Sequence, residues 1–103
     1  MKVKIDSNAY YLPEKKESNE SLKLDNPNWD MSKISDKTGV FTRSIASTHQ
    51  TAVDLAFEAG SRLLKDSSCK EDIDLVVLVT QSPDYVLPTS ACILQDRLGL
   101  SKK

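Results

Sequence analysis

The chain has 103 residues, of which 39% are hydrophobic and 28% are charged. This length allows one domain with a modest core, and the composition is that of a folded globular protein, which excludes disorder along the whole chain. The 14 basic and 15 acidic residues are interleaved, and no apolar run approaches the roughly 18 residues of a membrane span, so nucleic-acid binding and membrane insertion are not expected.

The first five residues alternate apolar and charged side chains and lead into no apolar signal-peptide segment, so we expect a soluble, cytoplasmic protein. Apolar and polar residues alternate over Val3–Tyr11, which predicts a strand that ends at Pro13. The segment Glu14–Asn28 is rich in Lys, Glu, Ser and Asn. We expect it to be a surface stretch with one short helical turn after Ser18.

A short helix is predicted after Trp29. Asp30 is placed to cap it, and Trp29 and Ile34 flank the cap with the spacing of a hydrophobic staple. Gly39 is expected to end the helix, because glycine takes positive φ without a Cβ clash. The β-branched and aromatic residues of Val40–Ile45 then predict a strand.

The clearest helix is expected to begin at Ser47 or Thr48 and to end before the polar segment Lys65–Asp72. Two adjoining stripes of small and apolar side chains predict a broadly buried face. These residues are Ala52, Ala56, Ala59 and Leu63 on one stripe, and Val53, Phe57, Gly60 and Leu64 on the other.

The nearly continuous apolar run Ile73–Thr80 is typical of a central parallel strand covered on both faces, and it predicts an α/β fold. A second helix is expected from Pro88 to Gly99, with Ala91, Leu94 and Leu98 on one face. That helix should lead into a further strand, so we expect residues 1–103 to form an incomplete part of a larger domain.

Spacing alone predicts no active site. His49, the only histidine, has no carboxylate or cysteine placed to orient it, and we interpret it as a solvated residue. Cys92 is interpreted as a core residue, and Cys69 as an accessible thiol without a partner. No metal-binding spacing occurs, and with three glycines the chain has no phosphate-binding loop.

Several short segments, taken in order and spacing, carry a resemblance to a known family. They are Lys37-Thr38-Gly39-Val40 with Arg43-Ser44-Ile45-Ala46, Phe57-Glu58-Ala59 with Arg62, Asp74-Leu75-Val76-Val77, Leu87-Pro88-Thr89-Ser90-Ala91-Cys92, and Gln95-Asp96-Arg97-Leu98-Gly99. Together they resemble the N-terminal third of β-ketoacyl-acyl-carrier-protein synthase III, a thiolase-fold condensing enzyme.

The resemblance implies an αβαβα sandwich of two similar halves and a homodimer. It also implies condensation of an acyl primer, carried on coenzyme A or acyl carrier protein, with malonyl carrier protein, and no bound cofactor. The family's nucleophilic cysteine, histidine and asparagine are expected beyond Lys103, so residues 1–103 alone should be inactive. A thiolate at a helix N-terminus is a stabilised nucleophile, which suits the first, acyl-accepting step.

The resemblance further places a coenzyme A site at Lys33, Lys37 and Thr38. Lys33 and Lys37 match the tryptophan and arginine that sandwich adenine in better-known members, so adenine stacking is in doubt. Trp29, one turn before Lys33, either supplies the missing ring or only staples the helix. We therefore expect acyl delivery on a carrier protein, or binding of coenzyme A mainly through its phosphates.

Leu87 matches the position that reaches across the dimer into the partner's acyl pocket, so it is either a determinant of primer size or a plain interface residue. Two alternatives to a condensing enzyme stay open. One is a thiolase-fold acyltransferase that does not condense, and the other is a standalone, non-catalytic α/β interaction module. An autonomous module should unfold cooperatively as a monomer, whereas a part of a larger sandwich should expose apolar surface.

Overall fold

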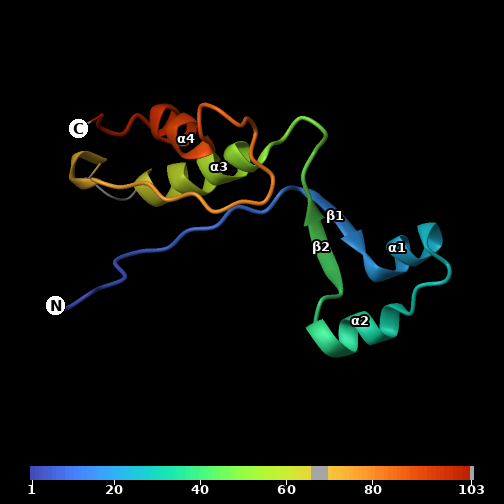
Figure 1. Cartoon of the computed structure of the whole chain (residues 1–103). Helices are drawn as coiled ribbons and strands as arrows, with labels where there is room; N and C mark the ends of the chain where they lie inside the picture. Colours follow the sequence, from blue (N-terminus) through green and yellow to red (C-terminus); the bar gives the residue numbers. More distant parts are fainter. Residues whose placement is uncertain (66–69, 103) are drawn as a thin grey trace. The chain divides into compact units, whose positions relative to one another are not determined.

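The structure is a computed structural model that describes residues 1–65 and 70–102. Its elements follow one another as shown in Figure 1. The chain divides into two compact units. One consists of Met1–Tyr11 with Gln50–Lys103, and the other of Leu12–His49.

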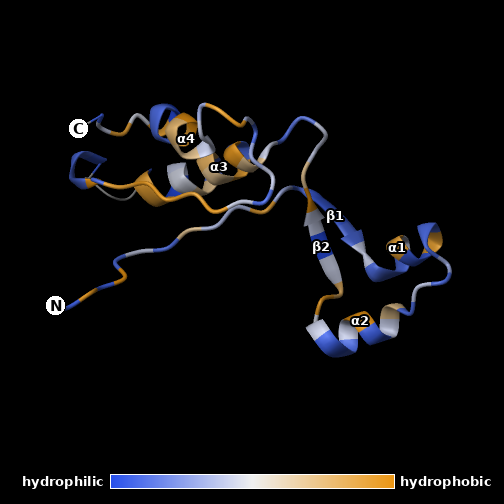
Figure 2. Ribbon diagram, in the orientation of Figure 1, coloured by the Kyte–Doolittle hydropathy of each residue, from blue (hydrophilic) through white to orange (hydrophobic). Residues whose placement is uncertain are grey.

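The unit Leu12–His49 is built on a two-stranded antiparallel sheet. Strand β1 (Lys15–Ser18) pairs with β2 (Thr42–Ile45), and the register places Lys15 opposite Ile45 and Ser18 opposite Thr42. Helix α1 (Asn19–Asp25) follows β1 directly, and helix α2 (Met31–Thr38) precedes β2. The unit has little apolar interior, and hydrophilic residues dominate its ribbon in Figure 2.

The predicted ends of α2 are confirmed. Asp30 is the N-cap residue, and Gly39 closes the helix with φ 68° while its N–H donates to the carbonyl of Ser35 at 2.8 Å. That left-handed conformation favours glycine, since a Cβ would clash with the backbone. The carboxylate of Asp30 makes no capping hydrogen bond and contacts other side chains instead.

Most residues of Glu14–Asn28 are exposed, as expected of a surface stretch. The helical turn after Ser18 is confirmed as α1, with the Ser18 hydroxyl accepting from the N–H of Ser21. The strand β1, however, was missed, because Lys15–Ser18 has no apolar alternation. Its pairing is set by β2 across the sheet, which a local pattern does not contain.

The second unit holds the apolar core. Helix α3 (Ala52–Lys65) packs against helix α4 (Ser90–Leu98), and a short 3₁₀ helix, η1 (Lys70–Asp72), lies between them in sequence. Gly60 allows close approach, because a Cβ there would lie 3.0 Å from Cδ1 of Leu98. The buried core residues are Val53, Leu64, Leu94, Leu98 and Leu100.

Helix α3 begins at Ala52, so the predicted start at Ser47 or Thr48 was wrong. The reason is a reciprocal cap. The N–H of Thr51 donates to the Asp54 carboxylate at 2.8 Å, and the N–H of Asp54 donates to the Thr51 hydroxyl at 3.3 Å. This Thr-x-x-Asp arrangement satisfies N–H groups that the first turn leaves without helical partners.

Arg97 links the two helices of the core. Its guanidinium lies 2.7 Å from the Asp54 carboxylate and over the ring of Phe57, 4.5 Å from its centroid. The hydrogen bond from the Thr51 backbone, followed by the contact with Arg97, lowers the pKa of Asp54. One side chain thus joins the α3 cap to the outer face of α4.

The two strands expected at Val3–Tyr11 and Ile73–Thr80 are absent from the described part of the chain, whose sheet contains only β1 and β2. A strand requires a second strand beside it in a hydrogen-bonded ladder, and the only ladder among the described residues is that of β1 with β2. Ile73, Val76 and Leu78 pack on the core, whereas Leu75, Val77 and Val79 are 78%, 73% and 90% exposed. The prediction of a run covered on both faces was therefore wrong for residues 1–103.

The N-terminal segment contacts α3. Arg62 donates to the carbonyl of Tyr10 at 3.2 Å and lies over the ring of Tyr11 at 4.9 Å, while Gln50 donates to the Tyr11 hydroxyl at 3.2 Å. These contacts explain why Tyr11 belongs to the same unit as α3. Among the described helices, none is both long enough and apolar enough to cross a membrane.

Candidate functional site

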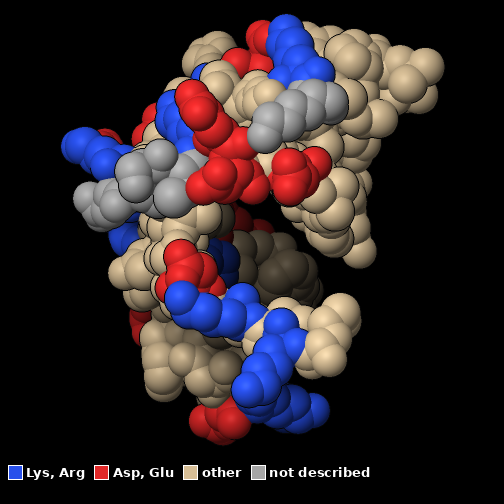
Figure 3. All heavy atoms as spheres, turned by 90° about the vertical axis from the view of Figure 1, so that its left-hand side faces the viewer, with Lys and Arg blue, Asp and Glu red and all other residues tan. Residues whose placement is uncertain are grey.

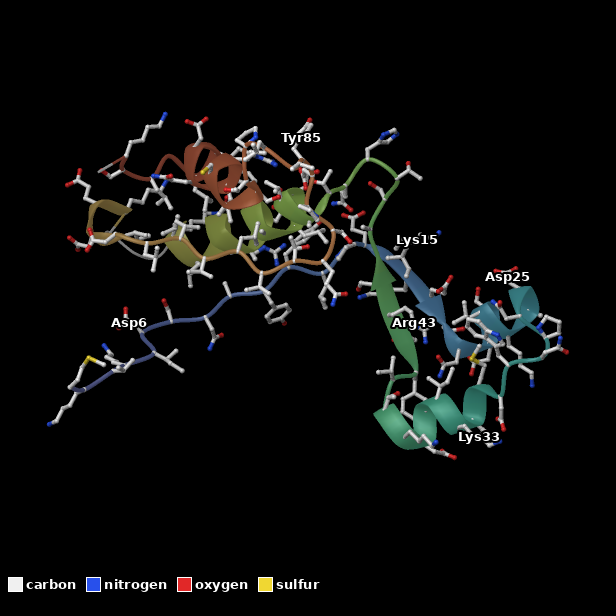
Figure 4. All side chains as sticks on the ribbon, viewed as in Figure 1. Asp6, Lys15, Asp25, Lys33, Arg43 and Tyr85 are labelled. Atoms are coloured by element: carbon white, nitrogen blue, oxygen red, sulfur yellow. The ribbon has the colours of Figure 1, made fainter. Side chains whose placement is uncertain are left out.

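Helix α2 carries the residues that the resemblance assigns to coenzyme A. Lys33 and Lys37 are four residues apart, so they lie on the same side of the helix, and both are exposed. Trp29 lies just before the helix and is 51% exposed. The structure therefore brings two ammonium groups and an indole onto the surface of one short segment, and Figure 4 marks Lys33 on α2.

Thr38 has a different place from the two lysines. Its hydroxyl donates to the Ile34 carbonyl at 2.6 Å and accepts from the N–H of Val40 at 3.2 Å. Both contacts satisfy backbone groups at the C-terminal end of α2. The hydroxyl of Thr38 is thus engaged in closing the helix, whereas the side chains of Lys33 and Lys37 make no contact of that kind and are exposed.

Asp30 changes the electrostatics of this surface. Its carboxylate lies 3.1 Å from the ammonium of Lys33 and accepts from the Ser32 hydroxyl at 2.6 Å. The Ser32 hydrogen bond, and then that of Lys33, lower the pKa of Asp30 to about 2. Asp30 is therefore charged at neutral pH, and it offsets part of the positive charge that Lys33 brings.

A buried asparagine supports the unit that presents α2. Asn19 is 5% exposed, donates from Nδ2 to the carbonyl of Val40 at 2.8 Å, and accepts a hydrogen bond from the Arg43 guanidinium. Its backbone N–H also donates to the carbonyl of Phe41 at 3.0 Å. Asn19 thus joins α1 to the chain that connects α2 with β2. Its burial was not predictable from the sequence, because an asparagine in a polar stretch carries no signal of burial.

Leu87 is 78% exposed, in the loop that precedes α4. Its neighbours Tyr85 and Val86 are 63% and 92% exposed, so three consecutive large apolar side chains face solvent. Contiguous exposed apolar residues are typical of an interaction site. Leu87 and α2 belong to different units, so the structure brings the residues of α2 together but does not add Leu87 to them.

Cys92 is exposed, so the interpretation as a core residue was wrong. It lies in the first turn of α4, off the stripe formed by Leu94 and Leu98, and the Thr89 hydroxyl donates to its sulfur at 3.3 Å. A cavity of about 220 Å³ touches Cys92, Gln95 and residues 73–76. The residues that line it include no histidine or lysine that could activate the thiol.

The remaining candidates add no chemistry. His49 is exposed in a turn, as expected for a solvated residue. Cys69 lies outside the described residues. Within residues 1–65 and 70–102, no group of three or more His, Cys, Asp or Glu side chains could hold a metal ion.

Figure 3 shows both acidic and basic side chains on the face that it draws. Exposed ion pairs include Lys4–Asp6 at 2.5 Å and Lys102–Asp96 at 2.9 Å. The presence of both signs of charge agrees with the 14 basic and 15 acidic residues of the sequence.

Comparison with known proteins places these features in a family context. No protein-family model matches the chain. A curated relative, β-ketoacyl-[acyl-carrier-protein] synthase III of Fusobacterium nucleatum subsp. nucleatum, is 36% identical over an alignment of 104 residues, which covers 97% of this chain and 30% of the relative. The chain thus spans about 30% of the length of the curated relatives that it matches.

The solved structures that resemble this chain are also condensing enzymes, and the chain again covers about 30% of each. A crystal structure of a 3-oxoacyl-(acyl-carrier-protein) synthase III matches with a TM-score of 0.81 and 45% identity, covering 93% of this chain and 29% of that chain. A tetronic acid condensing enzyme matches with a TM-score of 0.72 and 35% identity, covering 92% of this chain and 31% of that chain. The expectation of a segment of a thiolase-like α/β sandwich, incomplete on its own, is thereby confirmed.

Proposed function

Because the chain is related over almost its whole length to the N-terminal part of the β-ketoacyl-acyl-carrier-protein synthase III family, we propose that it is a segment of a condensing acyltransferase. The reaction joins an acyl primer, carried on coenzyme A or acyl carrier protein, to malonyl carrier protein in fatty acid or related biosynthesis. The observation that carries the proposal is the match at 45% identity and a TM-score of 0.81 to a synthase of this kind.

The proposal includes a cytoplasmic homodimer that works with acyl carrier protein, and no bound cofactor. The catalytic cysteine, histidine and asparagine of the family belong, in this proposal, to residues that follow Lys103. The thiol would accept the primer and the other two groups would stabilise the thioester oxyanion. The part played by residues 1–103 is to bind the primer carrier and to shape the acyl site.

The test is an assay of the product of the full reading frame with malonyl carrier protein and a series of acyl primers. We expect β-ketoacyl product and carbon dioxide in equal amounts, with primers longer or more branched than acetyl accepted. The reason for the second expectation is Leu87, which we propose shapes the partner's acyl pocket and leaves more room than the phenylalanine frequent at that position.

Leu87→Phe provides the matched variant. It should lower the kcat/KM ratio of a branched primer to acetyl by about tenfold or more, since one or two methylene equivalents in an apolar pocket are worth that much. Tyr85→Phe in the same loop serves as the control and should leave the ratio unchanged. A wild-type enzyme that uses only acetyl contradicts the role of Leu87. Acyl transfer without release of carbon dioxide contradicts condensation itself.

We further propose that α2 binds the nucleotide end of coenzyme A mainly through phosphate. The support is the pair of exposed side chains of Lys33 and Lys37, together with the sequence of α2, Met31–Thr38, which contains no arginine or aromatic residue to complete a stack with Trp29. Lysine attracts phosphate as a point charge but lacks the planar face of arginine.

Calorimetric titration of the chain with coenzyme A and with dephospho-coenzyme A tests this. We expect the loss of the 3′-phosphate, or the change Lys33→Met with Lys37→Met, to weaken binding by about three- to tenfold, as exposed ion pairs of moderate strength do. Trp29→Phe should change binding by less than about twofold if the ring contributes no stacking energy. A large loss on Trp29→Ala with no effect of the 3′-phosphate contradicts phosphate-led binding.

A further inference from the structure

Asp30, the acidic residue at the start of α2, has no part in the function proposed above. Its carboxylate nevertheless forms an ion pair with Lys33, one of the two lysines of that function. Lys33 and Asp30 are 3.1 Å apart, with side chains that are 73% and 51% exposed. Asp30 is also held in place by the Ser32 hydroxyl at 2.6 Å. The carboxylate is therefore fixed beside Lys33 by two contacts from its own helix.

This arrangement has a consequence for anions. A phosphate that approaches Lys33 meets a negative charge at the same ammonium group, and it has to replace the carboxylate or share the ammonium with it. The exposure of both side chains keeps the effect moderate, because water and salt screen charges on the surface. Lys37, one turn further along, forms no ion pair with the described residues, and its exposed side chain is free to contact an anion directly.

We propose that Asp30 is a specificity-determining residue that sets the phosphate affinity of the Lys33–Lys37 face of α2. It does so by holding the Lys33 ammonium in an ion pair that an incoming phosphate must replace. The inference rests on the proposed role of α2 in binding the carrier nucleotide. In this inference Asp30 lowers the affinity of the face for anions, and Lys37 makes the larger part of the phosphate contact.

The test uses the full 103-residue chain and adenosine 3′,5′-bisphosphate as the probe, titrated calorimetrically at low ionic strength. Asp30→Asn should tighten binding about threefold, the size expected for removing one like charge several ångströms from a phosphate in water. The gain should shrink in 0.5 M NaCl, where the screening length falls to a few ångströms. Asparagine is a good N-cap residue, so α2 should keep its helicity, which circular dichroism checks.

The matched control is Asp6→Asn. Asp6 forms a similar exposed pair with Lys4 at 2.5 Å, in the other unit, so its removal changes net charge by the same amount. We expect no change in affinity beyond about 1.5-fold, since distant surface charges are screened. In the Lys33→Met background, Asp30→Asn should lose the part of its effect that comes from freeing the Lys33 ammonium, and only the direct repulsion between carboxylate and phosphate should still be relieved.

The outcomes separate this inference from the function it rests on. If Asp30→Asn and Asp6→Asn behave alike, or if Asp30→Asn weakens binding, the role of Asp30 is overturned. In that case a loss of affinity on Lys33→Met or Lys37→Met still supports the binding face. If neither lysine variant changes the affinity, the binding face fails and the inference fails with it.

Discussion

Leu98→Ala should lower the free energy of unfolding of the α3–α4 unit by about 2–4 kcal/mol, the range for truncating a buried leucine in a core that cannot close the gap. Leu98 is 7% exposed, and its Cδ atoms lie against the backbone of Gly60. The core around it is small, so one lost side chain removes much of the packing between the helices. Urea unfolding followed by circular dichroism at 222 nm measures the change.

Gly60 supplies the matched control. In the wild type, Gly60→Ala places a Cβ 3.0 Å from Cδ1 of Leu98, so the contact offsets the gain in helix propensity. In the Leu98→Ala background the space is open, and the same change should stabilise α3. The cycle should therefore show a coupling of about 1 kcal/mol. Strict additivity of the two changes contradicts direct packing between Gly60 and Leu98.

The helices of this chain were predictable because their ends carry local signals. Gly39 and Gly99 end α2 and α4 with φ of 68° and 66°, and Asp30 and Thr89 occupy the N-cap positions. The start of α3 was misplaced because Ser47, Thr48 and Thr51 all have capping side chains. Thr51 is distinguished from the other two by its reciprocal hydrogen bonds with Asp54, which the structure shows.

The strands were not predictable in the same way, since a strand depends on a neighbour that lies elsewhere in the sequence. Lys15–Ser18 has no strand-like pattern but pairs with Thr42–Ile45. Leu75–Thr80 has the strongest strand pattern of the chain but forms no ladder among the described residues. Successive side chains of this segment still point to opposite sides, as in a strand. Val76 and Leu78 pack on the core, whereas Val77 and Val79 are exposed.

The candidate site came from a resemblance and not from spacing. Lys33 and Lys37 form no catalytic or metal-binding motif, and their common face is a consequence of the helix that Asp30 and Gly39 delimit. The contact between Asp30 and Lys33 could have been expected from their three-residue separation, a known ion-pair spacing on helices. The burial of Asn19 could not, because it depends on the chain that folds back at Val40–Arg43.

That burial leads to the second large expected effect. Asn19→Ala removes the donor to the Val40 carbonyl and the acceptor for the Arg43 guanidinium, two bonds made at a site that is 5% exposed. Polar groups left without partners in such a site cost about 1–3 kcal/mol each, so we expect the Leu12–His49 unit to lose about 2–3 kcal/mol. Arg43 keeps its longer contact with Glu17, at 3.6 Å.

Trp29 makes the measurement specific to that unit. It is the only tryptophan of the chain and lies between α1 and α2, so its fluorescence during urea unfolding reports on residues 12–49. Asn28→Ala, an exposed asparagine of the same unit, should change the midpoint little, as surface substitutions do. Arg43→Met in the Asn19→Ala background should recover part of the loss, because it removes the guanidinium that lost its acceptor. An Asn19→Ala midpoint equal to that of Asn28→Ala contradicts the assigned network, and the anchoring of α2 then has to come from the β1–β2 pairing alone.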